Sequence, residues 1–146
     1  MVGCTAGHGR RAWWLGSLNV VSSGGTCSRA WQAGTVERSW VRAMRADEVG
    51  AGEVRAVELS GPGRLAVWRT DDGQVAVLDD RCPHQWSSLA IAGDVEGCEL
   101  VCTTHGWRFG VDGRASKRSM LGRRDDKGET ATWPVREVDG WIEVQV

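Results

Sequence analysis

Hydrophobic and polar residues alternate in short runs along most of the chain, and these runs predict strands rather than helices. Residues 54–59 alternate between the two kinds, which is the period of a half-buried strand. The turn signal Gly61-Pro62-Gly63 follows, and the apolar run 65–69 leads back. Asp72-Gly73 is a typical hairpin turn into a further expected strand at 74–78. This first half therefore predicts an antiparallel meander.

The second half continues the same pattern of short strands and turns. Turns are expected at Asp112-Gly113 and Asp139-Gly140. Strands are expected around them at 99–101, 107–111, 131–135 and 141–146. Only residues 43–49 have the composition for a turn or two of helix, and the charged stretch 117–127 is expected to form a long exposed loop. The predicted fold class is all-β, an antiparallel sandwich or barrel.

The chain is expected to divide into a poorly ordered N-terminal extension, residues 1–39, and a single domain, residues 40–146. The extension is rich in Gly, Ser and Thr and shows no sustained period. It carries one targeting-like feature, Arg10-Arg11 before the apolar run 12–21. Asn19 interrupts that run and no clear cleavage site follows, which favours a loose tail over an export signal.

Composition and charge narrow the possible partners and the compartment. With 146 residues and a net charge of −1, the chain has no general attraction for nucleic acid or anionic lipid. No stretch approaches the roughly 20 apolar residues of a membrane-spanning helix, so neither nucleic acid nor a membrane is an expected partner. Five cysteines without the spacing of a disulfide scaffold favour a reducing compartment, and we expect a cytoplasmic protein.

Two pairs of cysteine and histidine carry the candidate chemistry. Cys82-Pro83-His84 and Cys102-Thr103-Thr104-His105 each follow an expected strand, and they use two of the three histidines in the chain. Either pair alone would be more simply explained as a buried cysteine beside an unrelated histidine. The presence of both pairs makes coincidence improbable. Thiolate and imidazole together are ligands of zinc and of iron–sulfur clusters.

The order of the ligand types distinguishes these two metals. Familiar zinc sites pair cysteine with cysteine and histidine with histidine. Here each loop contributes one of each, which suits a two-iron cluster whose one iron takes both thiolates and the other both imidazoles. A structural Cys2His2 zinc module that mediates protein contacts remains the alternative.

The motif C-x-H followed by C-x-x-H resembles the Rieske iron–sulfur family at all four positions. The similarity extends from about Trp40 to Val146 and includes the run 105–109, the segment 133–137 and the closing residues 139–144. These flanks look most like the Rieske domains of ring-hydroxylating oxygenases and their ferredoxins. Trp86 departs from the family, which often has a small residue there.

The resemblance implies one [2Fe–2S] cluster per chain. Cys82 and Cys102 would bind one iron, and His84 and His105 the other, with the imidazoles at a solvent-facing tip. High-potential relatives add a disulfide between the loops and hydroxyl donors to sulfur. The matching places here hold Ser87, Thr104, Trp107 and Phe109. They supply no disulfide, and neither Trp107 nor Phe109 has the expected hydroxyl. Fewer donors to sulfur favour the low end of the Rieske range of potentials.

The resemblance also implies an electron-transfer function. A complete oxygenase would need a further iron site of two histidines and one carboxylate, and only His8 remains outside the expected cluster. We therefore expect a ferredoxin-like carrier, or a small electron-transfer subunit, and not a complete enzyme. Its expected partners are proteins: a reductase, and a terminal oxygenase or other acceptor.

Overall fold

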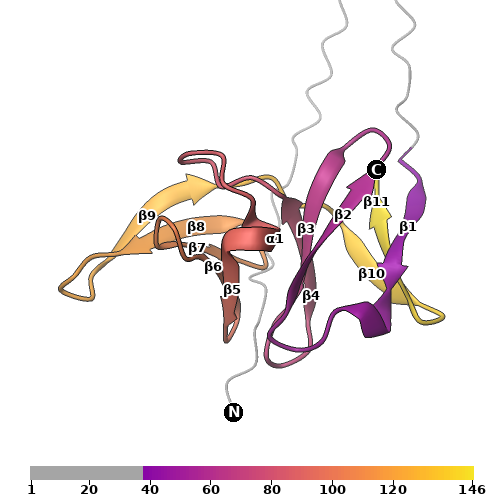
Figure 1. Cartoon of the computed structure of the whole chain (residues 1–146), viewed down its shortest axis with the longest axis horizontal. Helices are drawn as coiled ribbons and strands as arrows, with labels where there is room; N and C mark the ends of the chain where they lie inside the picture. Colours follow the sequence, from indigo (N-terminus) through magenta and orange to yellow (C-terminus); the bar gives the residue numbers. More distant parts are fainter. Residues whose placement is uncertain (1–37) are drawn as a thin grey trace, which may run out of the picture. The chain divides into compact units, whose positions relative to one another are not determined.

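The computed structural model describes residues 38–146, which fold into three antiparallel sheets (Figure 1). The first sheet has the order β1-β11-β10, from Trp40–Arg45, Trp141–Gln145 and Val135–Val138. The second has the order β2-β3-β4, from Val54–Leu59, Gly63–Arg69 and Val75–Asp79. The third runs β5-β6-β7-β8-β9, from Gly93–Glu96, Glu99–Cys102, Trp107–Gly110, Arg114–Arg118 and Arg124–Glu129. The expected all-β fold is confirmed.

The sheet β2-β3-β4 is covered on both faces, and this explains the unbroken apolar run in β3. Side chains of a strand point alternately to its two faces. Ala66 and Trp68 face a core shared with the five-stranded sheet, whereas Leu65 and Val67 face a second core shared with β11. All four are buried. The domain thus has two apolar cores, one on each side of this central sheet, and the cysteines of the candidate site border the first.

Several expected elements differ from the structure. Of residues 43–49, only Ala46–Glu48 are helical, as a short 3-10 turn. Met44 and Arg45 belong to strand β1 instead, because they pair with β11. The stretch 117–127 forms most of a β-hairpin instead of a loop, since β8 and β9 pair with Lys117 opposite Asp125. The strand expected at 131–135 is reduced to a single bridge at Thr132, and β10 begins only at Val135.

The other expectations are met or lie outside the described residues. β2 has the predicted bounds, and β3, β4, β6, β7 and β11 agree within one or two residues. At the last hairpin, Asp139 and Gly140 both have positive φ, as the turn signal predicted. No helix among residues 38–146 is long and apolar enough to span a membrane. The extension predicted for residues 1–39, with its Arg10-Arg11 pair, lies almost wholly outside the described residues.

Candidate metal centre

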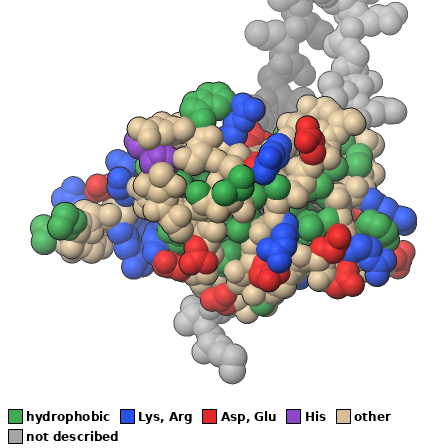
Figure 2. Space-filling view, in the orientation of Figure 1, with side chains coloured by type: hydrophobic (Ala, Val, Ile, Leu, Met, Phe, Trp, Pro, Cys, Tyr) green, Lys and Arg blue, Asp and Glu red, His purple; other side chains and the backbone are tan. Residues whose placement is uncertain are grey.

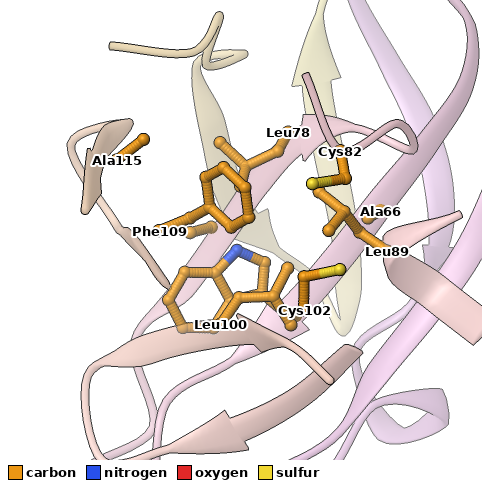
Figure 3. Close-up of a cluster of buried hydrophobic side chains, with 10 residues drawn as sticks. Ala66, Leu78, Cys82, Leu89, Leu100, Cys102, Phe109 and Ala115 are labelled. Atoms are coloured by element: carbon orange, nitrogen blue, oxygen red, sulfur yellow. The ribbon is translucent and has the colours of Figure 1, made fainter. Parts of the chain in front are cut away.

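Two loops at the ends of neighbouring sheets hold the candidate ligands. The first cysteine loop, residues 82–88, connects β4 to the short helix α1, Leu89–Ala92. The second cysteine loop, residues 102–106, joins β6 to β7. Both cysteines are fully buried at the edge of the core that contains Leu89 and Phe109 (Figure 3). The sequence pattern placed each pair at the end of a strand, and the structure agrees: β4 ends at Asp79, and β6 ends at Cys102 itself, one residue later than expected.

A buried carboxylate holds the first cysteine loop at both ends. Asp80, two residues before Cys82, accepts from the Ser88 hydroxyl, whose oxygen lies 2.8 and 2.9 Å from the two carboxylate oxygens, and from the Ala90 N–H at 2.7 Å. Its side chain is 1% exposed, and Arg64 pairs with it at 2.6 Å. Ser88 Oγ also accepts from the Ile91 N–H and so caps α1. Asp80 therefore joins the start of the loop to its end.

Within this loop, the backbone turns tightly around Cys82. The Cys82 N–H donates to the Ser87 carbonyl at 2.8 Å, and the Trp86 N–H donates to the Cys82 carbonyl at 2.8 Å. Trp86 adopts a positive φ of 62°, which is uncommon for a bulky residue. Its side chain is 70% exposed and lies beneath the Arg81 guanidinium, 5.1 Å from the ring centroid. The loop thus turns an indole outward beside the candidate ligands.

The second cysteine loop is held by backbone groups. The Cys102 carbonyl accepts from the N–H groups of His105 at 3.2 Å and Gly106 at 2.7 Å. Gly106 has a φ of 67°, which glycine adopts without the steric cost of a Cβ. Thr103 donates through its N–H and its hydroxyl to the Ala92 carbonyl, at 2.8 and 2.9 Å. This loop therefore depends on its own turn and on a contact with α1.

The four predicted residues come together between these loops. The sulfurs of Cys82 and Cys102 and a ring nitrogen of His105 lie within 4.8 Å of one another. The His84 ring is not in that group, but its centroid is 4.7 Å from that of His105 in an edge-on arrangement. His84 also stacks on Trp107, with 5.7 Å between centroids. Histidine side chains reach the surface, where Figure 2 shows them in purple; His84 is exposed and His105 is half-buried.

Burial of the Cys82 sulfur affects its protonation. Burial raises the pKa of the Cys82 thiol, and the neighbouring Cys102 acts in the same direction. The backbone N–H groups of His84 and Gln85 donate to the Cys82 sulfur and lower the pKa in opposition. Because a thiol must lose its proton to bind a metal, the donors favour the ligand form. They are also in place to stabilise negative charge on this sulfur.

The arrangement suits a cluster with two different ends. Two thiols face the apolar core, and two imidazoles lie on the solvent side. Such a donor set fits one iron with thiolate ligands and a second with neutral nitrogen ligands. Trp107 and Phe109, 6.3 Å apart at their centroids, continue the cover from the histidines into the core. The residues present therefore fit a Rieske-type cluster.

Two residues of the site were not singled out from the sequence. Asp80 was not distinguished from Asp79, although an acidic residue before the loop and Ser88 before an apolar run together resemble a helix-capping pattern. Gln85 lies inside the motif spacing, where no residue type is required. Its amide oxygen lies 3.0 Å from His105 Nε2.

A family model for the Rieske [2Fe–2S] domain matches residues 39–134. The chain belongs to this family. The Rieske domain is 34% identical over 100 residues to a cholesterol 7-desaturase of Ciona intestinalis, covering 68% of this chain and 21% of that protein. It is 32% identical over 114 residues to the oxygenase subunit of a 3-chlorobenzoate-3,4-dioxygenase from Comamonas testosteroni, covering 75% of this chain and 26% of the relative. The chain thus spans about a quarter or less of these relatives.

Solved structures agree with this assignment. The ferredoxin of Sphingomonas yanoikuyae B1 superposes with a TM-score of 0.61 at 28% identity, covering 74% of this chain and 99% of the ferredoxin. A dicamba monooxygenase superposes with a TM-score of 0.59 at 29% identity, covering 73% of this chain and 31% of the enzyme. The predicted likeness to oxygenase domains and their ferredoxins is confirmed. This Rieske domain binds one [2Fe–2S] cluster, a type of centre that carries single electrons.

Proposed function

We propose that Cys82 and Cys102 bind one iron of the cluster and that His84 and His105 bind the other. The observation that carries this proposal is the meeting of the two sulfurs and the His105 nitrogen within 4.8 Å, with the His84 ring against His105. When bound, the cluster supplies a reversible one-electron couple. Two thiolates neutralise its oxidised core, so reduction leaves one negative charge. With four thiolates, reduction would start from a charge of −2 and be harder.

The surrounding side chains bury the cysteine end of this site and leave the histidine end exposed. Leu89, Phe109 and the cysteines themselves are buried, which keeps water from the thiolate end. His84 is exposed and Trp86 is 70% exposed, so the imidazole end meets the solvent. We assign electron exchange to this exposed end, where a partner can approach without unfolding either loop.

The proposed partners are proteins, a reductase that delivers electrons and a terminal oxygenase or other acceptor that receives them. Support comes from the similarity to a structure of a complex between oxygenase and ferredoxin in carbazole 1,9a-dioxygenase, at 27% identity and a TM-score of 0.58. The exposed indole of Trp86 next to the histidines suits contact with a protein surface, since tryptophan is enriched at such interfaces. We place the protein in the cytoplasm, where a reducing environment would keep the Cys82 and Cys102 thiols available to the cluster.

Anaerobic purification and metal analysis test the ligand assignment. The protein should be red-brown and contain about two irons and two sulfides per chain. Reduction should produce a paramagnetic signal with nitrogen hyperfine coupling, because two ligands are imidazoles. A colourless protein that holds one zinc would replace this proposal by the structural zinc module.

The assignment of residues 40–146 to the cluster domain and of residues 1–39 to an extension belongs to the same proposal. All four proposed ligands lie within 40–146. Deletion of residues 1–38 should leave iron content and the thermal midpoint nearly unchanged. Loss of the cluster from this truncated chain would overturn the proposed division.

A further inference from the structure

The two histidines of the site have different surroundings. The His84 ring is exposed and is held by ring contacts, with Trp107 stacked at 5.7 Å and His105 edge-on at 4.7 Å. His105 is half-buried and both of its nitrogens have polar neighbours. Its Nδ1 lies 3.4 Å from Cys102 Sγ, and its Nε2 lies 3.0 Å from Gln85 Oε1. The candidate centre is therefore asymmetric at its solvent end.

The contact with Gln85 determines which nitrogen of His105 carries the proton. An amide oxygen only accepts hydrogen bonds, so Nε2 must donate. A neutral imidazole with its proton on Nε2 has its lone pair on Nδ1. That is the nitrogen facing Cys102. The hydrogen bond thus keeps His105 in the one tautomer that can bind a metal from inside the site.

Gln85 also connects the two cysteine loops. It follows His84 in the first loop, and its side chain reaches His105 in the second. A ligand histidine whose outer N–H donates to an acceptor is fixed in orientation and becomes more basic. Gln85 supplies such an acceptor to His105 from an exposed position on the first loop.

We propose that Gln85 is a positioning residue for His105, which holds the proton at Nε2, directs Nδ1 inward and leaves His84 as the open imidazole at the tip. This inference rests on the proposed ligand set. A more basic His105 stabilises the oxidised state of the site, so Gln85 makes reduction harder. The acceptor at position 85 therefore sets part of the potential.

Two substitutions of Gln85 separate the hydrogen bond from simple packing. Gln85→Leu removes the acceptor and should raise the equilibrium constant for reduction about three- to tenfold, which is about +28 to +59 mV for one electron. Gln85→Glu keeps an acceptor and adds negative charge, and it should lower that constant about tenfold or more, about −59 mV. Shifts of the potential in opposite directions in these two variants would show that the side chain at position 85 accepts a hydrogen bond from His105 Nε2. Gln145→Leu, on β11 in another sheet, is the matched control and should not shift the potential.

The measurement is a redox titration of the loaded protein at one fixed pH, with nitrogen hyperfine couplings of the reduced protein as a second readout. The couplings of one histidine should change in Gln85→Leu while those of the other stay. If Gln85→Leu loses the cluster but Gln85→Glu keeps it, the acceptor is again supported. Equal loss from both variants would show a packing role and overturn the inference.

Failure of this inference differs from failure of the ligand assignment. If the unsubstituted protein shows no Rieske-type signal, the ligand assignment falls and the inference falls with it. If that signal is present but both Gln85 variants keep the potential of Gln145→Leu, or shift it in the same direction, only the role of Gln85 is wrong.

Discussion

The two cysteine loops supply the same pair of residue types but are stabilised in different ways. In the first loop, the side chain of buried Asp80 binds Ser88 and the Ala90 N–H across the loop. In the second loop, the Cys102 carbonyl accepts two backbone N–H groups and Gly106 supplies the left-handed turn. The first loop thus depends on a carboxylate two residues before its ligand motif, and the second on a glycine directly after its motif.

This difference matches a difference between the two histidines, since His84 is exposed and His105 is half-buried. A side-chain anchor at its ends leaves the middle of the loop free to present His84 and Trp86 to the solvent. The tighter second loop keeps His105 half-buried between Cys102 and Gln85. The first loop, held at its ends, therefore suits a surface that contacts a partner. The second loop, held by its own turn, suits a ligand such as His105 that must stay in place.

The largest expected effect is common to both loops and tests whether either can hold the cluster alone. Cys82→Ser and Cys102→Ser should each abolish cluster binding, because each removes one of the two thiolates that neutralise the core. Iron content and visible absorption measure this, with circular dichroism as a check of folding. A folded variant with a full complement of iron would contradict the assignment of that cysteine.

The next effect should be confined to the first loop. Asp80→Ala removes a buried carboxylate and leaves Ser88 Oγ and the Ala90 N–H without their acceptor. We expect a loss of about 2–4 kcal/mol in the free energy of unfolding, since the bonds to a buried charged group are lost together. Urea denaturation provides the value. Ser88→Ala, the matched control, should cost about 1 kcal/mol, as for one helix cap.

An Asp80→Ala protein no less stable than Ser88→Ala would show that the carboxylate does not join the two ends of the loop. Arg64 does not change this comparison, because its side chain is half-exposed and can be hydrated when Asp80 is removed.

A smaller effect should be confined to the second loop. Gly106→Ala places a Cβ on a residue with φ of 67°, where its only near neighbour is Lys117 Cε at 4.0 Å. Backbone strain alone should then cost about 1–2 kcal/mol. Gly122→Ala, at φ of 78° with nothing near the added Cβ, is a matched control of similar cost. Only Gly106→Ala should also reduce iron content or alter the histidine couplings.

If the two glycine variants lose equal stability and retain identical clusters, the turn at Gly106 has no influence on the ligand geometry. The first loop would then still depend on Asp80, whereas the second loop would tolerate a change in its turn without an effect on the cluster.

The sequence predicted the parts of this structure that depend on local chemistry. The alternation at 54–59 and the turns at Gly73 and Gly140 act through neighbouring residues, and β2 and both turns lie where expected. The four candidate ligands were found because thiolate and imidazole are rare and their spacing is characteristic. These signals do not require knowledge of what the strands pack against.

Two of the three missed parts depend on partners far away in the sequence. β1 has weak strand character of its own and forms because it pairs with β11, almost a hundred residues later. The charged residues 117–127 form a hairpin through cross-strand pairs such as Lys117 with Asp125. Gln85 gains its role only when the second loop brings His105 to its amide. The contacts of β1 and Gln85 leave no pattern within one segment, whereas the hairpin was missed because its strands are mostly charged and show no alternation of apolar and polar residues.

The smallest expected effect concerns the apolar wall that both loops share. Phe109 is fully buried in the same core as Cys82 and Cys102 and brings no hydroxyl to that wall. With no hydroxyl donor from position 109 to add to the backbone N–H groups at Cys82, the midpoint potential should lie at about −150 to −50 mV near neutral pH, toward the low end of the Rieske range. A value above about +100 mV would show further donors around the sulfurs and reopen an assignment to a quinol-oxidising complex.

Phe109→Tyr tests that explanation directly. The core that holds this ring is apolar apart from the cysteine sulfurs and the indole N–H groups of Trp68 and Trp107. The Trp68 N–H is buried and has no hydrogen-bond partner among residues 38–146. That N–H only donates, so a new hydroxyl can give its proton to sulfur and accept from Trp68. One added hydrogen bond of about 0.5–1.5 kcal/mol should ease reduction by roughly +20 to +65 mV. Protein-film voltammetry measures the shift, and Trp68→Phe in the same background should leave it positive. A negative shift would show that the hydroxyl does not donate to sulfur and that the missing donor is not the cause of a low potential.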